Sequence, residues 1–314
     1  MAFKVAIVGA TGLVGGQMLK VMEERKLPVE AFPVASKGGY VRFMGKDVEV
    51  LPLSEDRIPD VDFALFAVEK EVSLQFAPLF VQKGITVIDN STAFRYDPNV
   101  PLVVPEINPG AIEGRLIANP NCSTIIFLRA IYPLHRKWKL KSAIVSTYQA
   151  VSGAGREGVF ALEDGGLGPF IFPIQGNVIP LIGSEGEDGY TTEEMKFERE
   201  GSKILGEEVS ITATCVRVPV HTGHCMSATL FFSSPPSIEE AESLIAEEPG
   251  LVLHSDLPPV PMEVAGTDSV LVGRIRRDRV FPSALCVWIC GDNLRVGAAS
   301  NAVGIMEEIW RRDF

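Results

Sequence analysis

The 314-residue chain has no apolar run long enough to cross a bilayer, only five cysteines and only four histidines. A membrane-spanning helix needs about 20 consecutive apolar residues, so we expect no membrane-embedded segment. The cysteines are odd in number, irregularly spaced and without a Cys-x-x-Cys pair, and no histidine joins them in a cluster. We therefore expect reduced thiols, with neither a disulfide framework nor a metal site.

Positive charge is scarce as well, because 29 Lys and Arg stand against 40 Asp and Glu, a net charge of -11. Nucleic-acid binding depends on Lys and Arg that neutralise phosphates, so we expect small-molecule partners and no nucleic acid or membrane. The chain enters an apolar segment directly after Met1, without the layout of a signal peptide. This predicts a cytoplasmic protein.

The composition is otherwise that of a globular protein, with 46% hydrophobic and 22% charged residues and no internal repeat. A chain of this length predicts two domains. An apolar strand over 4–8 runs into a glycine-rich turn over 9–15, and apolar residues then recur at helical spacing. This order is typical of a nucleotide-binding turn, in which glycines admit a pyrophosphate at a helix N-terminus. The candidate cofactor contacts in the turn are Gly9, Thr11, Gly12, Leu13 and Val14.

The second predicted strand, 29–35, is followed by Ser36 and Lys37. A site that prefers NAD usually has an acidic residue here, whereas a 2′-phosphate favours hydroxyl and cationic groups. Ser36 and Lys37 therefore indicate NADP, and the alternative is an ordinary solvated loop.

Further strands are predicted over 63–68 and 86–89, with a helix between them. This alternation predicts a Rossmann-like, doubly wound parallel sheet, and hence an α/β fold class. Arg95 follows the second of these strands at the edge where such sheets bind ligands. We therefore take Arg95 as a candidate anion ligand.

Cys122 lies between a polar turn that contains Pro120 and an apolar run with helical spacing. A thiol at a helix N-terminus is favoured as a thiolate, which is the nucleophilic form. The alternative is a buried, inert cysteine. The residues downstream favour the catalytic interpretation.

Gln149 ends a β-rich run over 142–148, where its amide can orient an acyl group, although it can also be an ordinary strand-end amide. Ser152 and Gly153 follow and would allow close approach of a cofactor. The segment 170–189 is rich in Pro and Gly and predicts an irregular loop, which ends where Thr191 and Glu194 have the spacing of a capping box.

Arg217 lies on a strand-like run over 209–220, and His224 follows in a turn. Arginine grips carboxylates and histidine exchanges protons near neutral pH, so both are candidate site residues. His221 is not excluded as the acid/base, whereas His135 and His254 have the positions of helix-end and strand-end residues. A helix over 237–248 and strands over 270–275 and 284–289 complete an α+β domain with a mixed or antiparallel sheet, and a last helix is predicted from Asn293 to Ile309.

With these segments together, the chain resembles the aspartate-β-semialdehyde dehydrogenase family over nearly its whole length. The similar segments are GATGLVG at 9, VIDNSTAFRYDPNVPLVVPEIN at 87, IANPNCSTI at 117, YQAVSGAG at 148, EEMK at 193, CVRVP at 215, GH at 223, VGRIRRD at 272 and DNLRVGAASNAV at 292. The resemblance implies an NADP-binding domain of residues 1–121 with 295–314, a catalytic and dimerisation domain of residues 122–294, and a homodimer or homotetramer.

The resemblance also implies roles for single residues. Cys122 would be the nucleophile, His224 the acid/base, and Gln149 the residue that positions the acyl intermediate. Arg217 would hold the substrate carboxylate and Glu193 its amino group. The phosphate would be bound by Arg95, Asn121 and Lys196, and Asn293 would join Ser152 and Gly153 in the cofactor site. By spacing alone, Glu193 and Lys196 predict only an exposed ion pair within a helix.

The implied reaction is the NADPH-dependent reductive dephosphorylation of L-4-aspartyl phosphate to L-aspartate-β-semialdehyde, in lysine (diaminopimelate), threonine and methionine biosynthesis. The alternatives are N-acetyl-γ-glutamyl-phosphate reductase, whose motif usually has Gly-Cys-Tyr where Asn121-Cys122-Ser123 stands, and a non-catalytic NADP-binding regulatory protein. Two departures from the family's pattern lie on the cofactor side, at residues 36–40 and 69–71. A third is Cys225, where relatives commonly have Ser.

Overall fold

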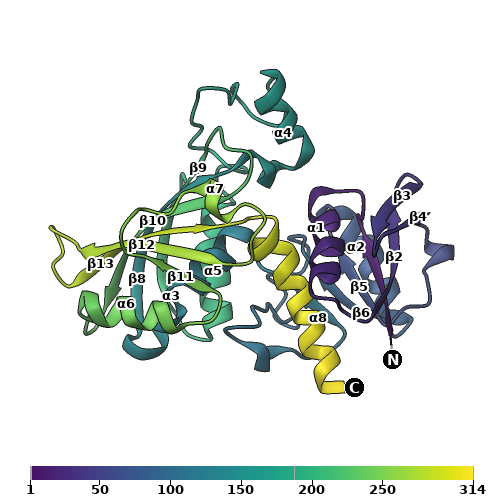
Figure 1. Cartoon of the computed structure of the whole chain (residues 1–314), viewed down its shortest axis with the longest axis horizontal. Coiled ribbons are helices and arrows are strands. Elements are labelled where there is room, and N and C mark those ends of the chain that lie inside the picture. Colours follow the sequence, from purple (N-terminus) through teal and green to yellow (C-terminus); the bar gives the residue numbers. More distant parts are fainter. Residues whose placement is uncertain (1, 187, 314) are drawn as a thin grey trace. The chain divides into compact units, whose positions relative to one another are not determined.

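The computed structural model describes residues 2–186 and 188–313, and the chain folds into two units. The first unit is Met1–Asn121 with Ala298–Phe314, and the second is Cys122–Gly297. Each unit has its own sheet (Figure 1). Each unit also has its own apolar core.

The sheet of the first unit has seven strands in the order β3-β4-β2-β1-β5-β6-β7. All neighbouring strands are parallel except β3, which forms an antiparallel hairpin with β4. The strands are β1 (Phe3–Val8), β2 (Val29–Ala35), β3 (Gly39–Phe43), β4 (Lys46–Pro52), β5 (Phe63–Phe66), β6 (Thr86–Asp89) and β7 (Leu116–Ala118). The prediction of a doubly wound parallel sheet is confirmed, while the β3–β4 hairpin was not anticipated.

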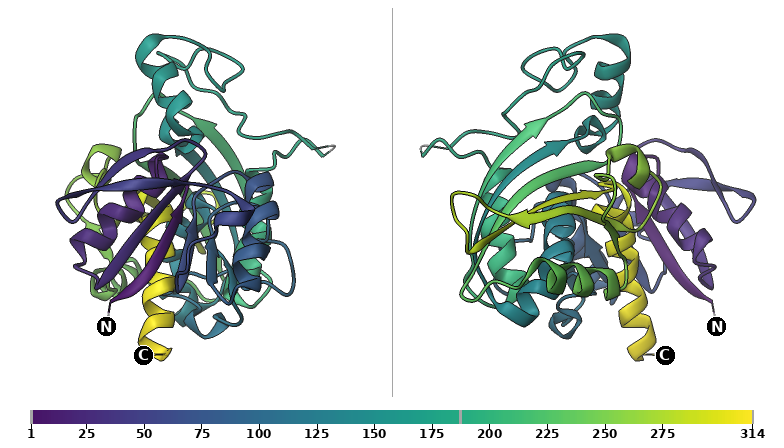
Figure 2. Two further views of the ribbon diagram at one scale, coloured as in Figure 1. Left: turned by 90° about the vertical axis from the view of Figure 1, so that its right-hand side faces the viewer. Right: turned by 60° about the vertical axis from the view of Figure 1, so that its left-hand side comes forward.

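Alternation along β1 gives this sheet two apolar faces. Val5 and Ile7 pack in a core with α1 (Leu13–Glu24) and α8 (Ser300–Asp313). Ala6 and Val8 pack in a second core with α2 (Lys70–Gln82). Side chains alternate between the faces of a strand, so both sides of β1 must be covered by helices. The C-terminal helix α8, yellow in Figure 1 and Figure 2, packs with α1.

The second unit has a six-stranded sheet in the order β11-β12-β13-β10-β8-β9. The two outer pairs, β11 with β12 and β8 with β9, are parallel, and the inner neighbours are antiparallel. The strands are β8 (Leu140–Gln149), β9 (Ser210–Arg217), β10 (His224–Phe232), β11 (Leu251–His254), β12 (Val270–Arg277) and β13 (Ala284–Gly291). The expected mixed sheet is therefore confirmed.

Three helices, α3 (Cys122–Trp138), α5 (Glu194–Leu205) and α6 (Ile238–Glu247), pack against the strands of this sheet. Phe127 of α3 and Phe197 of α5 meet edge to face with ring centroids 5.8 Å apart. The other helices are η1 (Glu55–Arg57), η2 (Pro109–Ala111), η3 (Val151–Ala154), α4 (Gly155–Asp164), α7 (Pro261–Val264) and the π-helix η4 (Arg295–Ala299). None of the helices in the described part of the chain is long and apolar enough to cross a membrane.

The sequence interpretation differs from this fold in further places. Strand β10 was not predicted, and His224, which was expected in a turn, is the first residue of that strand. Helix α4 was not predicted, because Gly155 and Gly158 fall within its first turns. The last helix was predicted to run without a break from Asn293, whereas the structure has the π-helix Arg295–Ala299 before α8 begins at Ser300.

Candidate active site

The glycine turn of the first unit lies at the point where the strand order reverses, between β1 and β5. Gly9 has φ +92°, and a Cβ there would lie 2.3 Å from the carbonyl oxygen of Ala67 after β5. A Cβ on Gly15 would lie 2.3 Å from the carbonyl oxygen of Gly9. No side chain fits at either position, and α1 begins at Leu13 directly after the turn. A cradle without side chains at a helix N-terminus fits a dinucleotide pyrophosphate.

The other predicted cofactor residues of this unit lie around the same sheet edge. Thr11 is exposed in the turn, and Leu13 and Val14 form the first turn of α1. Ser36 and Lys37 follow the last residue of β2 and are exposed. Both are therefore open to a ligand at the carboxyl end of the sheet, where such folds bind nucleotides.

Arg95 is held in a loop beyond β6. It is only 5% exposed, and its Nη2 donates to the carbonyl oxygen of Asn90 at 2.6 Å. The loop is fixed at Asp89, whose carboxylate accepts from the hydroxyls of Ser73 and Ser91, each at 2.6 Å. Burial raises the pKa of Asp89, and these hydrogen bonds oppose the rise. Arg95 is thus a buried cation on a loop that is held by hydrogen bonds at Asp89 and Asn90.

A chain of amides links this loop to the segment before Cys122. Asn119 Nδ2 donates to Asn90 Oδ1 at 2.8 Å, and Asn301 Nδ2 of α8 donates to Asn119 Oδ1 at 2.7 Å. Asn121, two residues beyond Asn119, is buried. The C-terminal helix therefore helps to hold the residues that carry the predicted anion ligands.

Cys122 is the first residue of α3, as predicted, and it is half-buried. Its Sγ lies 3.4 Å from Nε2 of His224, the first residue of β10. The sulfur is thus at the positive end of a helix and within reach of an imidazole. Both features favour a thiolate.

The second ring nitrogen determines the tautomer of His224. The backbone N–H of Ala150 donates to Nδ1 at 3.1 Å. A neutral ring whose Nδ1 accepts a hydrogen bond carries its proton on Nε2, which is the nitrogen that faces Cys122. Complete burial, and next the charge of Arg217, lower the pKa of His224 to about 3. The ring is therefore a neutral donor toward the sulfur.

Gln149 and Arg217 are direct neighbours in the parallel pair β8 and β9, and both are buried. Arg217 Nη1 donates to the carbonyl oxygen of Ala150 at 2.6 Å, while its buried Nε has no hydrogen-bond partner among the described residues. Burial lowers the pKa of Arg217, and the nearby Glu193 opposes this shift. A buried guanidinium with an unused donor is suited to a carboxylate ligand.

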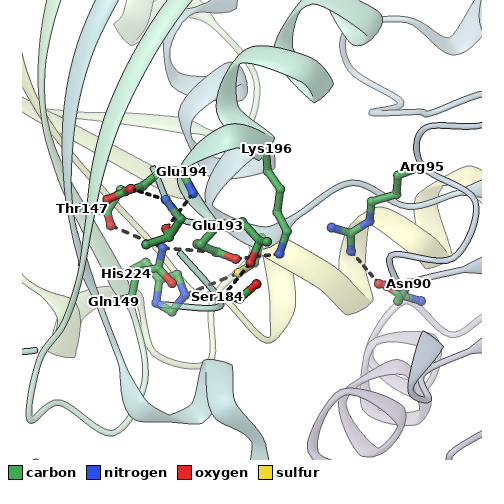
Figure 3. A network of polar contacts seen from close by, with 12 residues as sticks. Asn90, Arg95, Thr147, Gln149, Ser184, Glu193, Glu194, Lys196 and His224 are labelled. Atoms are coloured by element: carbon green, nitrogen blue, oxygen red, sulfur yellow. Dashed lines mark hydrogen bonds and ion pairs between the residues drawn. The ribbon is translucent and has the colours of Figure 1, made fainter. Parts of the chain in front are cut away.

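Glu193 and Lys196 correct the interpretation from spacing alone, which predicted an exposed ion pair. Glu193 is 7% exposed, and its Oε2 lies 2.6 Å from Lys196 Nζ. Gln149 Nε2 donates to the other oxygen, Oε1, at 3.3 Å. The structure therefore brings Gln149, Glu193, Lys196 and His224 to one end of the second sheet (Figure 3).

Ser152, Gly153 and Asn293, predicted to contact the cofactor, surround the same histidine. Asn293 Oδ1 accepts from the backbone N–H of Gly223 at 3.0 Å, and its Nδ2 donates to Ser152 Oγ at 3.0 Å. A Cβ on Gly153 would lie 2.9 Å from Arg217 Nη1 and 3.4 Å from His224 Nε2. These residues therefore leave no room for a larger side chain beside the site.

Sequence reasoning missed three residues that shape this site. Ala150 contacts both His224 and Arg217 through its backbone, for which a side-chain pattern holds no signal. A Cβ on Gly297 would lie 2.9 Å from the Cβ of Cys122, so the π-helix packs against the nucleophile. Glu194 was assigned only a capping role, whereas its carboxylate also accepts from the backbone N–H of Cys215.

The remaining histidines lie elsewhere. The His221 side chain is 58% exposed, with Nδ1 3.9 Å from Glu163. His135 lies near the end of α3 with Nε2 2.8 Å from Glu207, and His254 ends β11. In the described residues no group of three or more His, Cys, Asp or Glu is placed to hold a metal ion.

The chain is similar to known proteins over nearly its whole length. Residues 4–115 match the model of the semialdehyde dehydrogenase NAD binding domain, and residues 131–296 match that of the semialdehyde dehydrogenase dimerisation domain. Aspartate-semialdehyde dehydrogenase of Aquifex aeolicus is 42% identical over 332 residues, covering 98% of each chain, and that of Bacillus subtilis is 40% identical, covering 97% of this chain and 96% of the relative.

A solved structure of aspartate semialdehyde dehydrogenase II from Vibrio cholerae, complexed with ASA, covers 100% of both chains with a TM-score of 0.97 at 38% identity. A probable aspartate-semialdehyde dehydrogenase from Pseudomonas aeruginosa is also similar, with a TM-score of 0.93 at 26% identity over 100% of both chains. With two family models and near-complete relatives in agreement, the chain belongs to the aspartate-semialdehyde dehydrogenase family.

Proposed function

We propose that the protein reduces L-4-aspartyl phosphate to L-aspartate-β-semialdehyde and releases phosphate, with NADPH as the reductant, in lysine, threonine and methionine biosynthesis. The observation that carries this proposal is the 3.4 Å contact between Cys122 Sγ and His224 Nε2. The contact places the Nε2–H donor of His224 next to a nucleophile at a helix N-terminus. Arg217 and Glu193, which are both buried, lie beside this pair. Aspartate-semialdehyde dehydrogenases of other organisms are about 40% identical over nearly the full chain.

In the first step the Cys122 thiolate attacks the acyl carbon of the substrate. A carbon–sulfur bond forms, the bond between that carbon and the phosphate oxygen breaks, and phosphate leaves with the electron pair. Before attack, the helix N-terminus and the Nε2–H of His224 stabilise the thiolate. The product is a thioester on Cys122.

The charges of the substrate can be matched by the charged side chains. Arg217 would grip the carboxylate through its unused Nε, and Glu193 would accept from the amino group. Arg95, Asn121 and Lys196 would bind the phosphate. The substrate has a dianionic phosphate at one end and a carboxylate at the other, so it needs cations at both ends. Arg95, Lys196 and Arg217 are the three cations among the proposed ligands.

When bound at the glycine turn, the reduced nicotinamide supplies the hydride that the thioester carbonyl accepts. The amide of Gln149 would orient that acyl group. His224 would then stabilise the negative oxygen of the tetrahedral intermediate through a hydrogen bond from its Nε2–H, which is the donor side of the predicted acid/base role. Collapse breaks the carbon–sulfur bond and returns the thiolate of Cys122 with release of the aldehyde.

We propose NADP as the cofactor because Ser36 and Lys37 are exposed after β2. Lys37→Ala is expected to raise the KM for NADP about tenfold, because a cationic contact with the 2′-phosphate is lost, and to leave the KM for NAD within about twofold. Initial rates with each cofactor measure this. The matched control is Lys46→Ala, an exposed lysine at the start of β4. Equal changes with both cofactors would contradict the assignment.

We propose a homodimer as the basic assembly, from which a homotetramer can be built. The second unit matches a dimerisation domain, and it exposes large apolar side chains that an interface between two copies could cover. They include Ile144, Tyr148, Phe160, Ile171, Phe172 and Val178. Light scattering is expected to give at least twice the chain mass of 34.1 kDa. A monomer at micromolar concentration would contradict this. We also propose a cytoplasmic location, which agrees with the finding that no cysteine forms a disulfide in the described part of the chain.

The substrate is tested in the reverse direction. NADP reduction is measured with phosphate and either L-aspartate-β-semialdehyde or N-acetyl-L-glutamate-γ-semialdehyde, with the wild-type protein. The expected result is a kcat/KM at least about a hundredfold higher for the first aldehyde, because Glu193 would accept from a free amino group that acetylation removes. The opposite preference would indicate the acetylglutamyl enzyme. Cofactor binding without turnover of either aldehyde would indicate the regulatory protein.

A further inference from the structure

The carboxylate of Glu194 bridges two backbone amides that are distant in sequence. Its Oε2 accepts from the N–H of Thr191 at 2.8 Å, and its Oε1 accepts from the N–H of Cys215 at 2.8 Å. The N–H of Glu194 in turn donates to Thr191 Oγ1 at 3.3 Å. Glu194 is only 8% exposed. Both carboxylate oxygens of Glu194 thus accept hydrogen bonds from the protein's own backbone. Glu194 therefore differs in role from a residue that binds substrate.

The amide of Cys215 lies on the open edge of the second sheet. β9 is an outermost strand, paired on one side with β8. Two residues further on, Arg217 faces the same edge and exchanges backbone hydrogen bonds with Ile179 at 2.8 and 2.9 Å. Residues two apart on a strand share an edge, so Glu194 satisfies an edge donor that would otherwise be buried unpaired. It ties the start of α5 to β9 two residues from Arg217.

Glu193 precedes Glu194 and has helical dihedral angles, φ -71° and ψ -44°. Successive side chains of a helix point about 100° apart. The side chain of Glu193 therefore points in a different direction from that of Glu194, which contacts β9. Glu193 instead contacts Gln149 at 3.3 Å and Lys196 at 2.6 Å. Gln149 is paired in register with Arg217. The attachment of α5 to β9 therefore determines where Glu193 meets Gln149 and Arg217.

We infer that Glu194 is a positioning residue for the substrate site, a role that rests on the proposed function. Its bridge between Thr191 and Cys215 places Glu193 and Lys196 relative to Gln149 and Arg217. Loss of the bridge lets the first turn of α5 move on β9, which separates the carboxylate and the ammonium from the bound aldehyde and weakens binding.

The test uses Glu194→Gln and Glu194→Asp in the full-length protein. Glutamine has one oxygen and an NH₂ group that cannot accept, so one of the two amides loses its acceptor. Aspartate keeps the charge but is too short to bridge both amides. Each variant is expected to raise the KM for L-aspartate-β-semialdehyde about tenfold or more, with a smaller fall in kcat and with the KM for NADP within about twofold of wild type.

The matched control is Glu198→Gln, which removes the same charge from an exposed position on the same helix. It is expected to leave both KM values unchanged. A wild-type KM in Glu194→Gln would overturn the inference, and so would full recovery in Glu194→Asp, which would indicate that charge alone matters. Parallel increases in both KM values would indicate a general loss of structure. If Glu194→Gln fails to fold, Glu194→Asp carries the test.

Hydrogen exchange keeps this inference separate from the proposed function. Peptides that contain Thr191 and Cys215 are expected to exchange faster in Glu194→Gln than in the wild type or in Glu198→Gln, because one of the bridged amides loses its acceptor. Equal exchange would overturn the bridge. A wild-type protein without turnover of the aldehyde would contradict the proposed function, and hydrogen exchange would still decide whether Glu194 holds α5 to β9.

Discussion

Cys122→Ala is expected to lower kcat about 10⁴-fold or more while the affinity for NADPH stays within about twofold of wild type. The thioester route needs a sulfur at the start of α3, and no other cysteine side chain contacts His224 in the described residues. The cofactor is proposed to bind at the glycine turn of the first unit, so its affinity should not depend on this thiol. Initial rates and titration of NADPH fluorescence measure the two quantities.

The control for this substitution is Cys286→Ser. Cys286 is buried on β13, and its hydrogen bonds within the described residues are to Asp278 and Thr229, not to His224 or Arg217. Activity within about twofold of wild type is expected. If Cys122→Ala lost NADPH binding together with turnover, the substitution would have damaged the structure, and the nucleophile would remain unidentified by it.

His224→Ala is expected to lower kcat by about 10²- to 10⁴-fold, the usual range for removal of a proton donor at reacting atoms. It should also slow the alkylation of Cys122 by iodoacetamide at neutral pH, because the thiolate loses the Nε2–H that lies 3.4 Å from its sulfur. The KM for NADP should change little. Steady-state rates and the alkylation rate, followed by peptide mass spectrometry, are the two measurements.

His221→Ala is the matched control, because His221 is three residues earlier and its side chain is 58% exposed. It is expected to retain wild-type rates. The sequence alone did not exclude His221 as the acid/base. A large loss of kcat in His221→Ala with a small loss in His224→Ala would assign that role to His221 instead. An unchanged alkylation rate in His224→Ala would show that the ring does not stabilise the thiolate.

His224→Ala is also expected to change how the free energy of unfolding depends on pH. The pKa of His224 is lowered from 6.5 to about 3 in the folded protein. Between these values the unfolded chain binds a proton that the folded chain does not, so this group makes the free energy of unfolding fall as the pH falls. His224→Ala removes that term, and its free energy of unfolding should depend less on pH over this window. Urea unfolding at a series of pH values measures the difference.

The first unit was predictable because its signals are local. The apolar strand before Gly9 and the helical spacing after Gly15 occur within about twenty residues. The spacing of apolar residues in each segment is characteristic of its secondary structure. The helix that begins at Cys122 was predictable for the same reason. The β3–β4 hairpin was not, because its strands are mostly exposed and lack the apolar pattern of the others.

The candidate site was less predictable because its contacts are distant in sequence. Glu193 and Lys196 have the spacing of a surface pair, and only the packing of α5 on β9 buries them. The resemblance to a family, not the spacing, pointed to their role. Ala150 has no functional side chain, so no residue pattern indicates that its N–H contacts His224 and its carbonyl contacts Arg217.

The most direct test of the account is a single-turnover experiment without phosphate. Wild-type protein is mixed with NADP and L-aspartate-β-semialdehyde, and NADPH formation is followed together with the mass of the intact chain. The account predicts a burst of about one NADPH per chain, an acyl group on the peptide that contains Cys122, and release of that group when phosphate is added. A burst with no mass change at Cys122, or full turnover without phosphate, would contradict the thioester mechanism.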